Sequence, residues 1–244
     1  MGQTATTNKP RYKKLTVQRS ELKYLLGLED RLFLLKALDT LLTPDAYGDY
    51  SGYSVRSVYF DGVDEQDYIG KKKKVGFQKR IRLRIYDTSD QTAKFEFKKK
   101  WSDNQIKESQ VVSRADALEM LGGNFEVLRK YNTDTAKLGY ELCKTMQYRP
   151  VSMVQYKRRA YTHPQFSTRI TLDNELQYCN FNNGLFEPDN HNFINVTDIT
   201  ETILEVKYEN FLLPYIQQVL QQCNLKKCHI SKFGSSRALL DQLH

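Results

Sequence analysis

The sequence predicts an α+β fold, in which an antiparallel β-sheet, either open or closed into a barrel, has helices packed on its outside. Eight segments alternate apolar and polar residues with the period of a β-strand, and five helical patterns lie between or after them. Few long crossovers separate the strands, which favours antiparallel pairing. The chain has no internal repeat and no linker rich in Gly, Ser or Pro. We therefore expect a flexible tail over residues 1–10 and a single domain over residues 11–244.

Each expected strand has the length and the content of β-branched or aromatic residues that strands favour. The eight are Leu15–Lys23, Ser54–Phe60, Gln78–Tyr86, Lys94–Trp101, Gln105–Val112, Val151–Tyr161, Thr168–Asn174 and Thr202–Tyr208. Helices are expected over Glu29–Leu42, Arg114–Leu121, Glu126–Met146, Leu212–Cys223 and from Ser235 onward.

Two local signals refine this outline. The segment Ser113–Asp116 has the pattern of a helix start, with a capping serine and an acidic residue in the first turn. The segment Asn180–Asp198 is rich in Asn, Gly and Asp, which predicts a loop. A functional lid and a tolerated insertion fit this loop equally well.

The composition is that of a folded, basic protein. Hydrophobic residues make up 40% and charged residues 27% of the 244 positions, which argues against disorder and against a fibrous repeat. The chain has 37 Lys and Arg against 29 Asp and Glu, a net charge of +8. This excess suits nucleic acid, a membrane surface or a small polyanion, and a merely basic surface is the alternative.

Other sequence features point to the cytoplasm. The four cysteines lack CxxC spacing and form neither a zinc pattern nor a dense disulfide framework, which favours a reducing compartment. No apolar run is long enough to span a bilayer, and the first ten residues lack the apolar core of a signal peptide. We therefore expect a soluble cytoplasmic domain.

Several common functional motifs are absent from the sequence. There is no P-loop and no GxGxxG opening a helix, which removes the common ATPase, kinase and dinucleotide scaffolds. The four histidines are too scattered for a zinc site. Neither an RNP signature nor a KH-type GXXG loop indicates RNA binding.

Charged residues share faces of the expected strands. Because successive side chains of a strand alternate, the three arginines of the segment QKRIRLRIY lie on one face and its aliphatic residues on the other. Other strands repeat this pairing of an apolar face with a mixed, mainly basic one. Their charged faces carry Glu96 and Lys98, Arg169 and Asp173, Glu205 and Lys207, and one of the neighbours Arg158 and Arg159.

Two architectures fit these faces. A flat sheet would turn the charge toward water and the apolar face toward helices. A barrel would turn it into a tunnel of Arg and Lys, which is costly unless water and a polyanion fill it. Arginine suits bidentate phosphate contacts. Glu205 among these cations would suit Mg²⁺ or Mn²⁺, while a salt bridge to Lys207 or a neighbouring arginine is the structural alternative.

The order of motifs resembles the polyphosphate polymerase domain of the vacuolar transporter chaperone (VTC) family, within the CYTH-like triphosphate tunnel metalloenzymes. The resemblance runs from about Leu15 to Arg237. Its motifs are Arg19-x-Glu21-x-Lys23-Tyr24, SVYFD (Ser57–Asp61), RLRIY (Arg82–Tyr86), FEFK (Phe95–Lys98), YKRRAY (Tyr156–Tyr161), RITLD (Arg169–Asp173), LEVK (Leu204–Lys207) and SKF (Ser231–Phe233).

The resemblance implies an eight-stranded antiparallel β-barrel tunnel and an enzyme, a metal-dependent ATP:polyphosphate phosphotransferase. It would transfer the γ-phosphate of ATP onto a growing inorganic polyphosphate chain with Mn²⁺ or Mg²⁺, and pyrophosphate is a further expected ligand. Glu205 matches the family's metal ligand. The expected catalytic residues are Lys23, Arg82, Arg84, Lys98, Arg158, Arg169 and Lys232, and the expected substrate-binding residues are Lys107, Tyr156, Ser231 and His229.

The chain departs from the family pattern at two positions. Many tunnel triphosphatases begin with ExExK, whereas Arg19 stands in the first position here, which favours the polymerase branch over the hydrolase branch. His229 stands where the family often has lysine, so a neutral imidazole would remove a positive contact or make it dependent on pH.

Two alternative functions stay open. The first is a tunnel hydrolase of tripolyphosphate or nucleoside triphosphates, which needs much the same tunnel with water as the acceptor. The second is a non-catalytic module that binds polyphosphate or RNA, with Glu205 merely salt-bridged. No nucleic acid partner is expected for the polymerase, and any coupling to a membrane would come from a separate membrane protein.

Overall fold

The structure is a computed structural model that describes residues 19–47, 51–73, 76–101, 104–181, 184–188 and 193–243. The tail expected over residues 1–10 and the first four residues of the strand expected from Leu15 lie outside the described residues. In the described part no helix is both long and apolar enough to cross a membrane.

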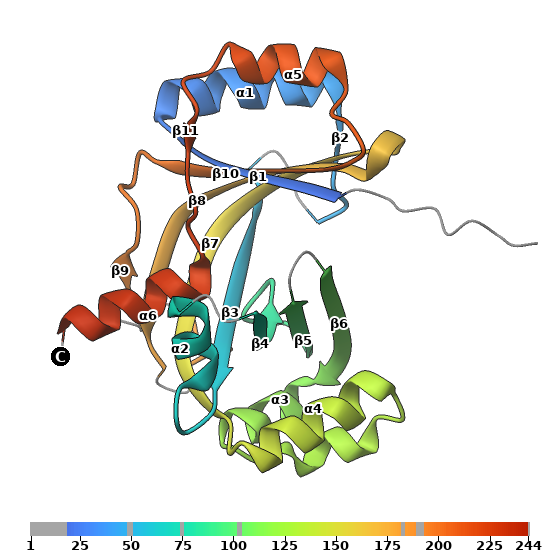
Figure 1. The fold of residues 1–244 in the computed structure, drawn as a ribbon, viewed down its shortest axis with the longest axis vertical. Helices are drawn as coiled ribbons and strands as arrows, with labels where there is room; N and C mark the ends of the chain where they lie inside the picture. Colours follow the sequence, from blue (N-terminus) through green and yellow to red (C-terminus); the bar gives the residue numbers. More distant parts are fainter. Residues whose placement is uncertain are drawn as a thin grey trace, which may run out of the picture.

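Eight long strands form the body of the sheet, and every pairing in it is antiparallel (Figure 1). In spatial order they are β1 (Arg19–Leu26), β10 (Thr202–Glu209), β8 (Thr168–Asn180), β7 (Arg149–His163), β3 (Tyr53–Asp61), β4 (Phe77–Ile85), β5 (Thr92–Trp101) and β6 (Asn104–Ser113). Three two-residue strands add to it: β2 (Thr43–Pro44) on β7, β9 (Ile194–Asn195) on β8 and β11 (Lys226–Lys227) on β1.

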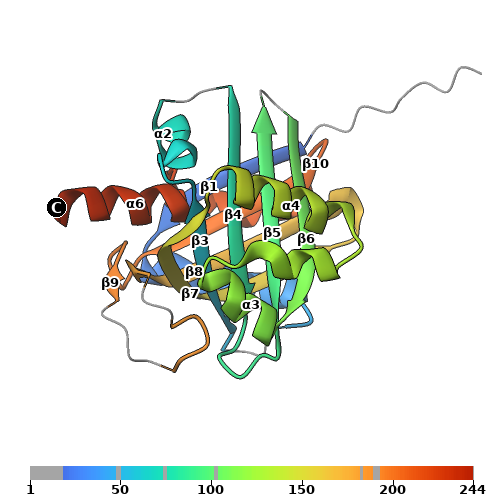
Figure 2. The same cartoon turned by 90° about the horizontal axis from the view of Figure 1, so that it is seen from below.

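The α+β class and the antiparallel sheet are confirmed, but the closed eight-stranded barrel is not confirmed among the described residues. The sheet there has eleven strands and stays open, with β6 at one end and β11 at the other. Closure would need the free edge of β1, and β11 occupies part of that edge by pairing with Tyr24 and Leu25. In Figure 2, β4, β5 and β6 run across the direction of β1 and β10. The sheet therefore curls without closing.

Two apolar cores lie on the outer face of this curled sheet, under separate helical layers (Figure 1). Helices α1 (Leu28–Leu41) and α5 (Pro214–Gln221) pack together over β1, β10 and β8, where Leu34, Leu204 and Ile216 are fully buried. Helices α3 (Arg114–Leu121) and α4 (Asp134–Thr145) cover β4, β5 and β6 with the 3₁₀ turn Phe125–Lys130. Burial of these outward aliphatic side chains stabilises the fold and leaves the opposite face to the charged residues.

The structure differs from the predicted elements in two helical regions. The helix expected over Glu126–Met146 is interrupted, because Tyr131 is extended and the Thr133 hydroxyl accepts from the Ala136 N–H to begin α4. The seven-residue helix α2 (Gln66–Lys72) was not predicted, since it is too short to show a helical period. The predicted cap at Ser113 is confirmed, because its Oγ accepts from the Asp116 N–H.

A third apolar core lies against the inner face, where α2 and α6 (Lys232–Leu243) pack side by side (Figures 1 and 2). Phe233 in the first turn of α6 is buried against Tyr59 of β3 and Tyr68 of α2, with ring centroids 5.2 and 6.3 Å away. Arg237 of α6 is paired with Glu65, which precedes α2. These contacts fix both helices beside the charged part of the inner face.

Candidate active site

The inner face of the sheet collects the charged side chains of alternate positions on its strands. The strand registers place Arg82 opposite Glu96, Lys23 opposite Glu205, and Arg158 opposite Asp173. Because paired residues of adjacent strands project to the same side of a sheet, each of these pairs meets on one face. Three carboxylates organise the cations of this inner face: Glu96, Asp173 and Glu205.

Glu96 is buried among cations of β4 and β6. Its Oε2 lies 2.5 Å from Arg82 Nε and 3.6 Å from Arg84 Nε, and its Oε1 pairs with Lys107. Arg82 also donates to the hydroxyl of Tyr59 at 3.1 Å. Burial opposes the ionisation of Glu96, but the cations outweigh it and lower its pKa to about 2. The carboxylate therefore stays ionised and holds two arginines along β4.

Asp173 on β8 forms a more enclosed cluster. Arg158 grips it with two bonds, from Nε to Oδ1 at 2.6 Å and from an η nitrogen to Oδ2 at 2.8 Å. Lys232, the first residue of α6, reaches the same Oδ2 at 2.6 Å. The ring of Tyr156 lies under both cations, 5.2 Å from the Arg158 guanidinium carbon and 4.5 Å from Lys232 Nζ. Against the effect of burial, these cations lower the pKa of Asp173 to about 2.

Glu205 on β10 is held by lysines alone. Its two oxygens lie 2.5 Å from Lys207 Nζ and 3.1 Å from Lys23 Nζ. Lys23 also lies 3.0 Å from Glu21, two positions earlier on β1. Burial disfavours the charge on Glu205, but Lys207 and Lys23 outweigh it and hold its pKa well below the usual range of a carboxyl. The sequence left two roles open for Glu205, a salt bridge and a metal ligand. The salt bridge is present, and it does not exclude the second role, because a salt-bridged carboxylate is also an ionised oxygen donor.

The donors around Glu205 fit a hard divalent cation. Glu21 and Glu205 share Lys23, and Thr171, the partner of Glu205 on β8, has a buried hydroxyl without a hydrogen bond in the described part of the structure. Mg²⁺ and Mn²⁺ are held in phosphate-transfer sites by one or two carboxylates, with substrate oxygens completing the shell. No cluster of three or more His, Cys, Asp and Glu side chains occurs among the described residues, so a metal here would depend on the substrate for further ligands.

The remaining predicted cations occupy different settings. Arg169 on β8 lies 2.9 Å from Asp45, which also accepts from the Tyr53 hydroxyl. The side chain of Lys98 on β5 forms no hydrogen bond or ion pair with any described residue. Burial and the nearby charges of Arg80, Lys207 and Lys23, only partly offset by Glu21, lower the pKa of Lys98 to about 8. Charges on β1 and β10 thus act on a lysine of β5, because the curl of the open sheet places its two ends close together.

The sequence of this chain matches the VTC domain over residues 18–241. The chain belongs to the VTC domain family. A candidate adenylyl cyclase from Hippeastrum, described as having a dominant triphosphatase activity, superposes with a TM-score of 0.55 at 13% identity, over 89% of this chain and 94% of that chain. A candidate adenylate cyclase from Bacillus halodurans gives a TM-score of 0.49 at 13% identity, over 87% and 95%. No curated protein matches the sequence.

The match to the VTC domain confirms the family expected from the order of motifs. The Hippeastrum likeness, at 13% identity, concerns the fold alone. The reaction and its substrate are not part of that likeness.

Neighbouring arginines of this VTC domain show how the sheet sorts its side chains. Arg158 points to Asp173 on the inner face, whereas Arg159 bonds Asp39 of α1 at 2.5 Å on the outer face. The sequence alternation requires opposite faces for the two residues but does not say which is which. The family spacing placed Arg158 inside, and the structure has it there.

Two predicted substrate-binding residues, Ser231 and His229, have no side-chain hydrogen bond or ion pair with the three carboxylates in the described part of the structure. The Ser231 hydroxyl accepts from the Gly234 N–H at 3.3 Å and so caps the start of α6. His229 is exposed in the segment between β11 and α6. Arg19 also bears on the predicted site, but its side chain lies outside the described part.

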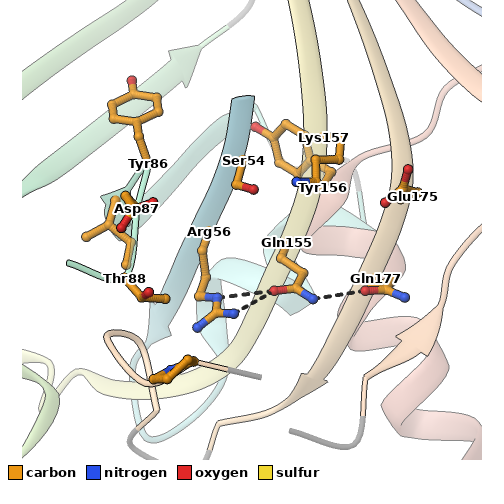
Figure 3. A pocket seen from close by; sticks show the side chains of 12 residues that line it. Ser54, Arg56, Tyr86, Asp87, Thr88, Gln155, Tyr156, Lys157, Glu175 and Gln177 are labelled. Atoms are coloured by element: carbon orange, nitrogen blue, oxygen red, sulfur yellow. Dashed lines mark hydrogen bonds between the residues drawn. The ribbon is translucent and has the colours of Figure 1, made fainter. Parts of the chain in front are cut away.

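A separate pocket of about 340 Å³ lies beside the bulge of β7 between Gln155 and Lys157 (Figure 3). In Figure 3 the guanidinium of Arg56 points to Gln155, which in turn bonds Gln177 at 2.9 Å. Arg56 also donates to the carbonyl of Glu187 at 2.5 Å, so it ties the segment 184–188 to β3. Of the predicted site residues only Tyr156 lines this pocket, which is therefore not the predicted phosphate site.

Sequence reasoning did not include four inner-face residues in the predicted site. Glu96 and Asp173 are the anchors of two clusters, and Lys207 is a partner of Glu205. Arg80 lies opposite Lys98 in the ladder between β4 and β5. The strand alternation already placed all four on charged faces. What it lacked was the pairing between strands, which decides whether a charged residue anchors others or meets solvent.

Proposed function

We propose that this VTC domain is a metal-dependent phosphotransferase that moves the γ-phosphate of ATP onto the end of an inorganic polyphosphate chain. The observation that carries the proposal is the charge of the inner face. Glu96 is shared by three cations and Asp173 by two, so positive charge remains in excess around both, whereas Glu21 and Glu205 balance Lys23 and Lys207. A curled surface of this kind suits a linear polyanion, because arginine forks and lysine ammonium groups satisfy many phosphate oxygens at once.

The state of the carboxylates supports transfer to phosphate rather than to water. Cations lower the pKa of Glu96 and Asp173 to about 2 and hold that of Glu205 well below its usual range, so all three are weak bases. Activation of water calls for a general base with a pKa near the working pH. The terminal phosphate of a polyphosphate chain is already an anion near neutral pH and needs no such base.

In the proposed step, an oxygen of the terminal chain phosphate attacks the γ-phosphorus of ATP in line. A P–O bond to the chain forms, the bond between the γ-phosphorus and the β–γ bridging oxygen breaks, and ADP leaves with that oxygen. Arg82 and Arg84, held side by side by Glu96, would orient the transferred group. Phosphoryl transfer depends mainly on such alignment and neutralisation of charge. Glu205 with Glu21 would hold Mg²⁺ or Mn²⁺, which supplies further neutralisation of the phosphates when bound.

Hydrolysis of tripolyphosphate or of a nucleoside triphosphate is the second candidate. The shared fold with the Hippeastrum protein, described as a triphosphatase, favours it. The two reactions differ only in the acceptor, since the inner face would hold the donor triphosphate in the same way. A product analysis therefore separates them.

The test incubates the purified protein with ATP, Mn²⁺ and a trace of pyrophosphate or short polyphosphate. Products are run on a gel stained for polyphosphate, and free phosphate and ADP are measured in parallel. A ladder of lengthening polyphosphate with ADP release, lost in Glu205→Gln, is the expected result. Free phosphate without a ladder would replace the proposal with hydrolysis, and binding without any turnover would leave a polyphosphate-binding module.

A matched control keeps the charge change but moves it off the inner face. Glu126 lies in the 3₁₀ turn Phe125–Lys130 and pairs with Lys144 of α4, so Glu126→Gln removes an equivalent carboxylate far from the clusters. This variant should form the same ladder as the wild type. Loss of the ladder in both variants would mean that the assay reports folding or general charge rather than the site.

A further inference from the structure

A group of cations on the inner face lacks carboxylate partners. Arg80 of β4 lies opposite Lys98 of β5, and Lys98 lies opposite Lys107 of β6, so one row across three strands carries three like charges. Lys107 is paired with Glu96. Neither the Arg80 nor the Lys98 side chain forms an ion pair or hydrogen bond with a described residue, and the same holds for the side chain of Lys71 near the end of α2.

This group is unfavourable for the folded protein by itself. Like charges directly opposite one another destabilise a sheet. Burial, followed by the charges of Arg80 and Lys23, lowers the pKa of Lys71 to about 8, and burial also lowers the pKa of Arg80. Lys71 further lies against the first turn of α6, the positive end of a helix dipole. The nearby acidic groups of Tyr59, Glu21 and Asp67 offset the effect on Arg80 only in part, so the arrangement is suited to an anion that arrives from outside.

The fold holds Lys71 in this place through several contacts. The carboxylate of Asp61 accepts from the backbone N–H groups of Asp67 and Tyr68, both at 3.0 Å, and so fixes the start of α2. Tyr68 packs against Phe233 of α6. A Cβ added to Gly234 would collide with Lys71 Nζ, so the ammonium group rests directly on the backbone of this glycine. These contacts hold Lys71 in one position, unlike a lysine that extends freely into solvent.

We propose that Lys71 and Arg80 form a second anion subsite at the junction of α2 and α6, beside the phosphate-transfer site, that binds a polyphosphate chain beyond its reacting end. The inference rests on the proposed function and adds a specificity to it. The cations around Glu96 and Glu205 would hold a triphosphate, and the junction would hold phosphates that only a longer chain has. The preferred ligand is therefore a linear polyphosphate longer than tripolyphosphate.

The experiment compares the binding of two probes, tripolyphosphate and long-chain polyphosphate, to the wild type and to Lys71→Gln by calorimetry at fixed ionic strength. The variant should lose about tenfold in affinity for the long chain, equivalent to about 1.4 kcal/mol. Its affinity for tripolyphosphate should change less than about twofold, because salt screens the charge of Lys71 from a ligand that does not reach it. Equal losses for the two probes, or no loss for either, would overturn the subsite.

Two further variants separate position from charge. Lys73→Gln removes the same charge at the exposed end of α2 and should leave both affinities unchanged. Gly234→Ala keeps every charge and improves the helix propensity of α6, but its methyl group displaces the Lys71 ammonium. It should selectively weaken the binding of long-chain polyphosphate, as is expected for Lys71→Gln, without lowering the melting temperature of the protein. If Lys73→Gln matches Lys71→Gln, the effect is general electrostatics and the subsite is wrong.

The outcomes also distinguish this inference from the proposed function. A wild type that binds neither probe contradicts both. If the wild type builds polyphosphate from ATP, but Lys71→Gln and Lys73→Gln have the same affinity for the long chain, the subsite alone is contradicted. If the subsite is right, Lys71→Gln should still make the first transfer to pyrophosphate at the wild-type rate and should give shorter final products on the gel.

Discussion

Asp173 on β8 and Glu205 on β10 each bind two cations, yet their surroundings differ. The Asp173 side chain is 1% exposed and is gripped by Arg158 in two bonds, whereas Glu205 is 16% exposed and is held by lysines that are 28% and 44% exposed. A two-pronged arginine contact fixes both oxygens in one plane, while lysine is a point charge on a flexible stem.

The difference indicates that the Asp173 cluster stabilises the fold, whereas the Glu205 cluster can release its lysines to a ligand. A ligand that approached Asp173 would have to break a buried bidentate pair and free the end of α6. One that approached Glu205 needs only to draw two partly exposed lysines toward its phosphates, which leaves the carboxylate free for a metal ion. We therefore expect mutations at Asp173 to act on folding and mutations at Glu205 to act on function.

The largest predicted effect is the loss of stability in Asp173→Asn. This change leaves the buried guanidinium of Arg158 and the ammonium of Lys232 without their counter-ion. Breaking a buried pair by removing one partner costs about 3–5 kcal/mol. Urea denaturation should show a lower midpoint with an unchanged slope.

Asp39→Asn is the matched control on the outer face, where Asp39 is 28% exposed and accepts from Arg159 and Tyr161. Its loss of stability should be less than half that of Asp173→Asn, because solvent can compensate the freed arginine. Equal losses would mean that the enclosure of Asp173 contributes nothing, which removes the structural side of the comparison.

The second predicted effect is a loss of triphosphate affinity in Arg82→Ala. Arg82 is fixed by Glu96 and Tyr59 at the centre of the row on β4. A charge-assisted hydrogen bond contributes about 1.5–3 kcal/mol, so the dissociation constant of tripolyphosphate should rise by about one to two powers of ten. Arg114→Ala, which removes an arginine bonded to the carbonyl of Thr88, should leave this constant unchanged. An unchanged constant in Arg82→Ala would place Arg82 outside the binding surface.

Much of this arrangement could be predicted from the sequence, because strand alternation is a local property. The strands expected over Ser54–Phe60 and Gln78–Tyr86 agree with β3 and β4 to within a residue at each end. The arginines of β4 share a face because the chain alternates, whatever the sheet does around them. The family resemblance then indicated which face mattered.

The open edge of the sheet and the roles of the anchors could not be predicted in this way. Closure depends on whether β6 reaches β1, and the two-residue strand β11, which takes part of that edge, is too short to show a pattern. Glu96 and Asp173 look like ordinary strand carboxylates until the register brings arginines opposite them. Lys71 lies on a helix with no detectable period, so its place beside α6 follows only from tertiary contacts.

The third prediction concerns Lys98, which has no carboxylate partner in the described part of the fold. Burial and neighbouring cations lower its pKa to about 8, from about 10.5 when it is free. The charged form is therefore disfavoured in the folded state, and Lys98→Met should raise the free energy of unfolding at about pH 7 by about 1–2 kcal/mol. The same variant should bind tripolyphosphate more weakly.

The sign of the pH dependence follows from this shift. Below about pH 8 the cost of charging Lys98 is fully present; between about pH 8 and 10.5 the folded protein has lost a proton that the unfolded chain keeps, so stability rises with pH. The advantage of Lys98→Met over the wild type should therefore shrink between about pH 7 and pH 10 in urea denaturation. An advantage that is constant over this range would mean that packing, not charge, is responsible.

The smallest predicted change in stability is that of Glu205→Gln. Its partners Lys23 and Lys207 are partly exposed, so the free energy of unfolding without metal should fall by less than about 1 kcal/mol, as for pairs near the surface. The effect of Glu205→Gln on ligand binding should, in contrast, be large. Added Mn²⁺ and tripolyphosphate together should raise the melting temperature of the wild type and not that of Glu205→Gln, because ligand binding to the native state stabilises it. A variant that loses as much stability as Asp173→Asn and keeps the Mn²⁺ response would reverse the roles of the two carboxylates, and with them the division between a structural and an exchangeable cluster.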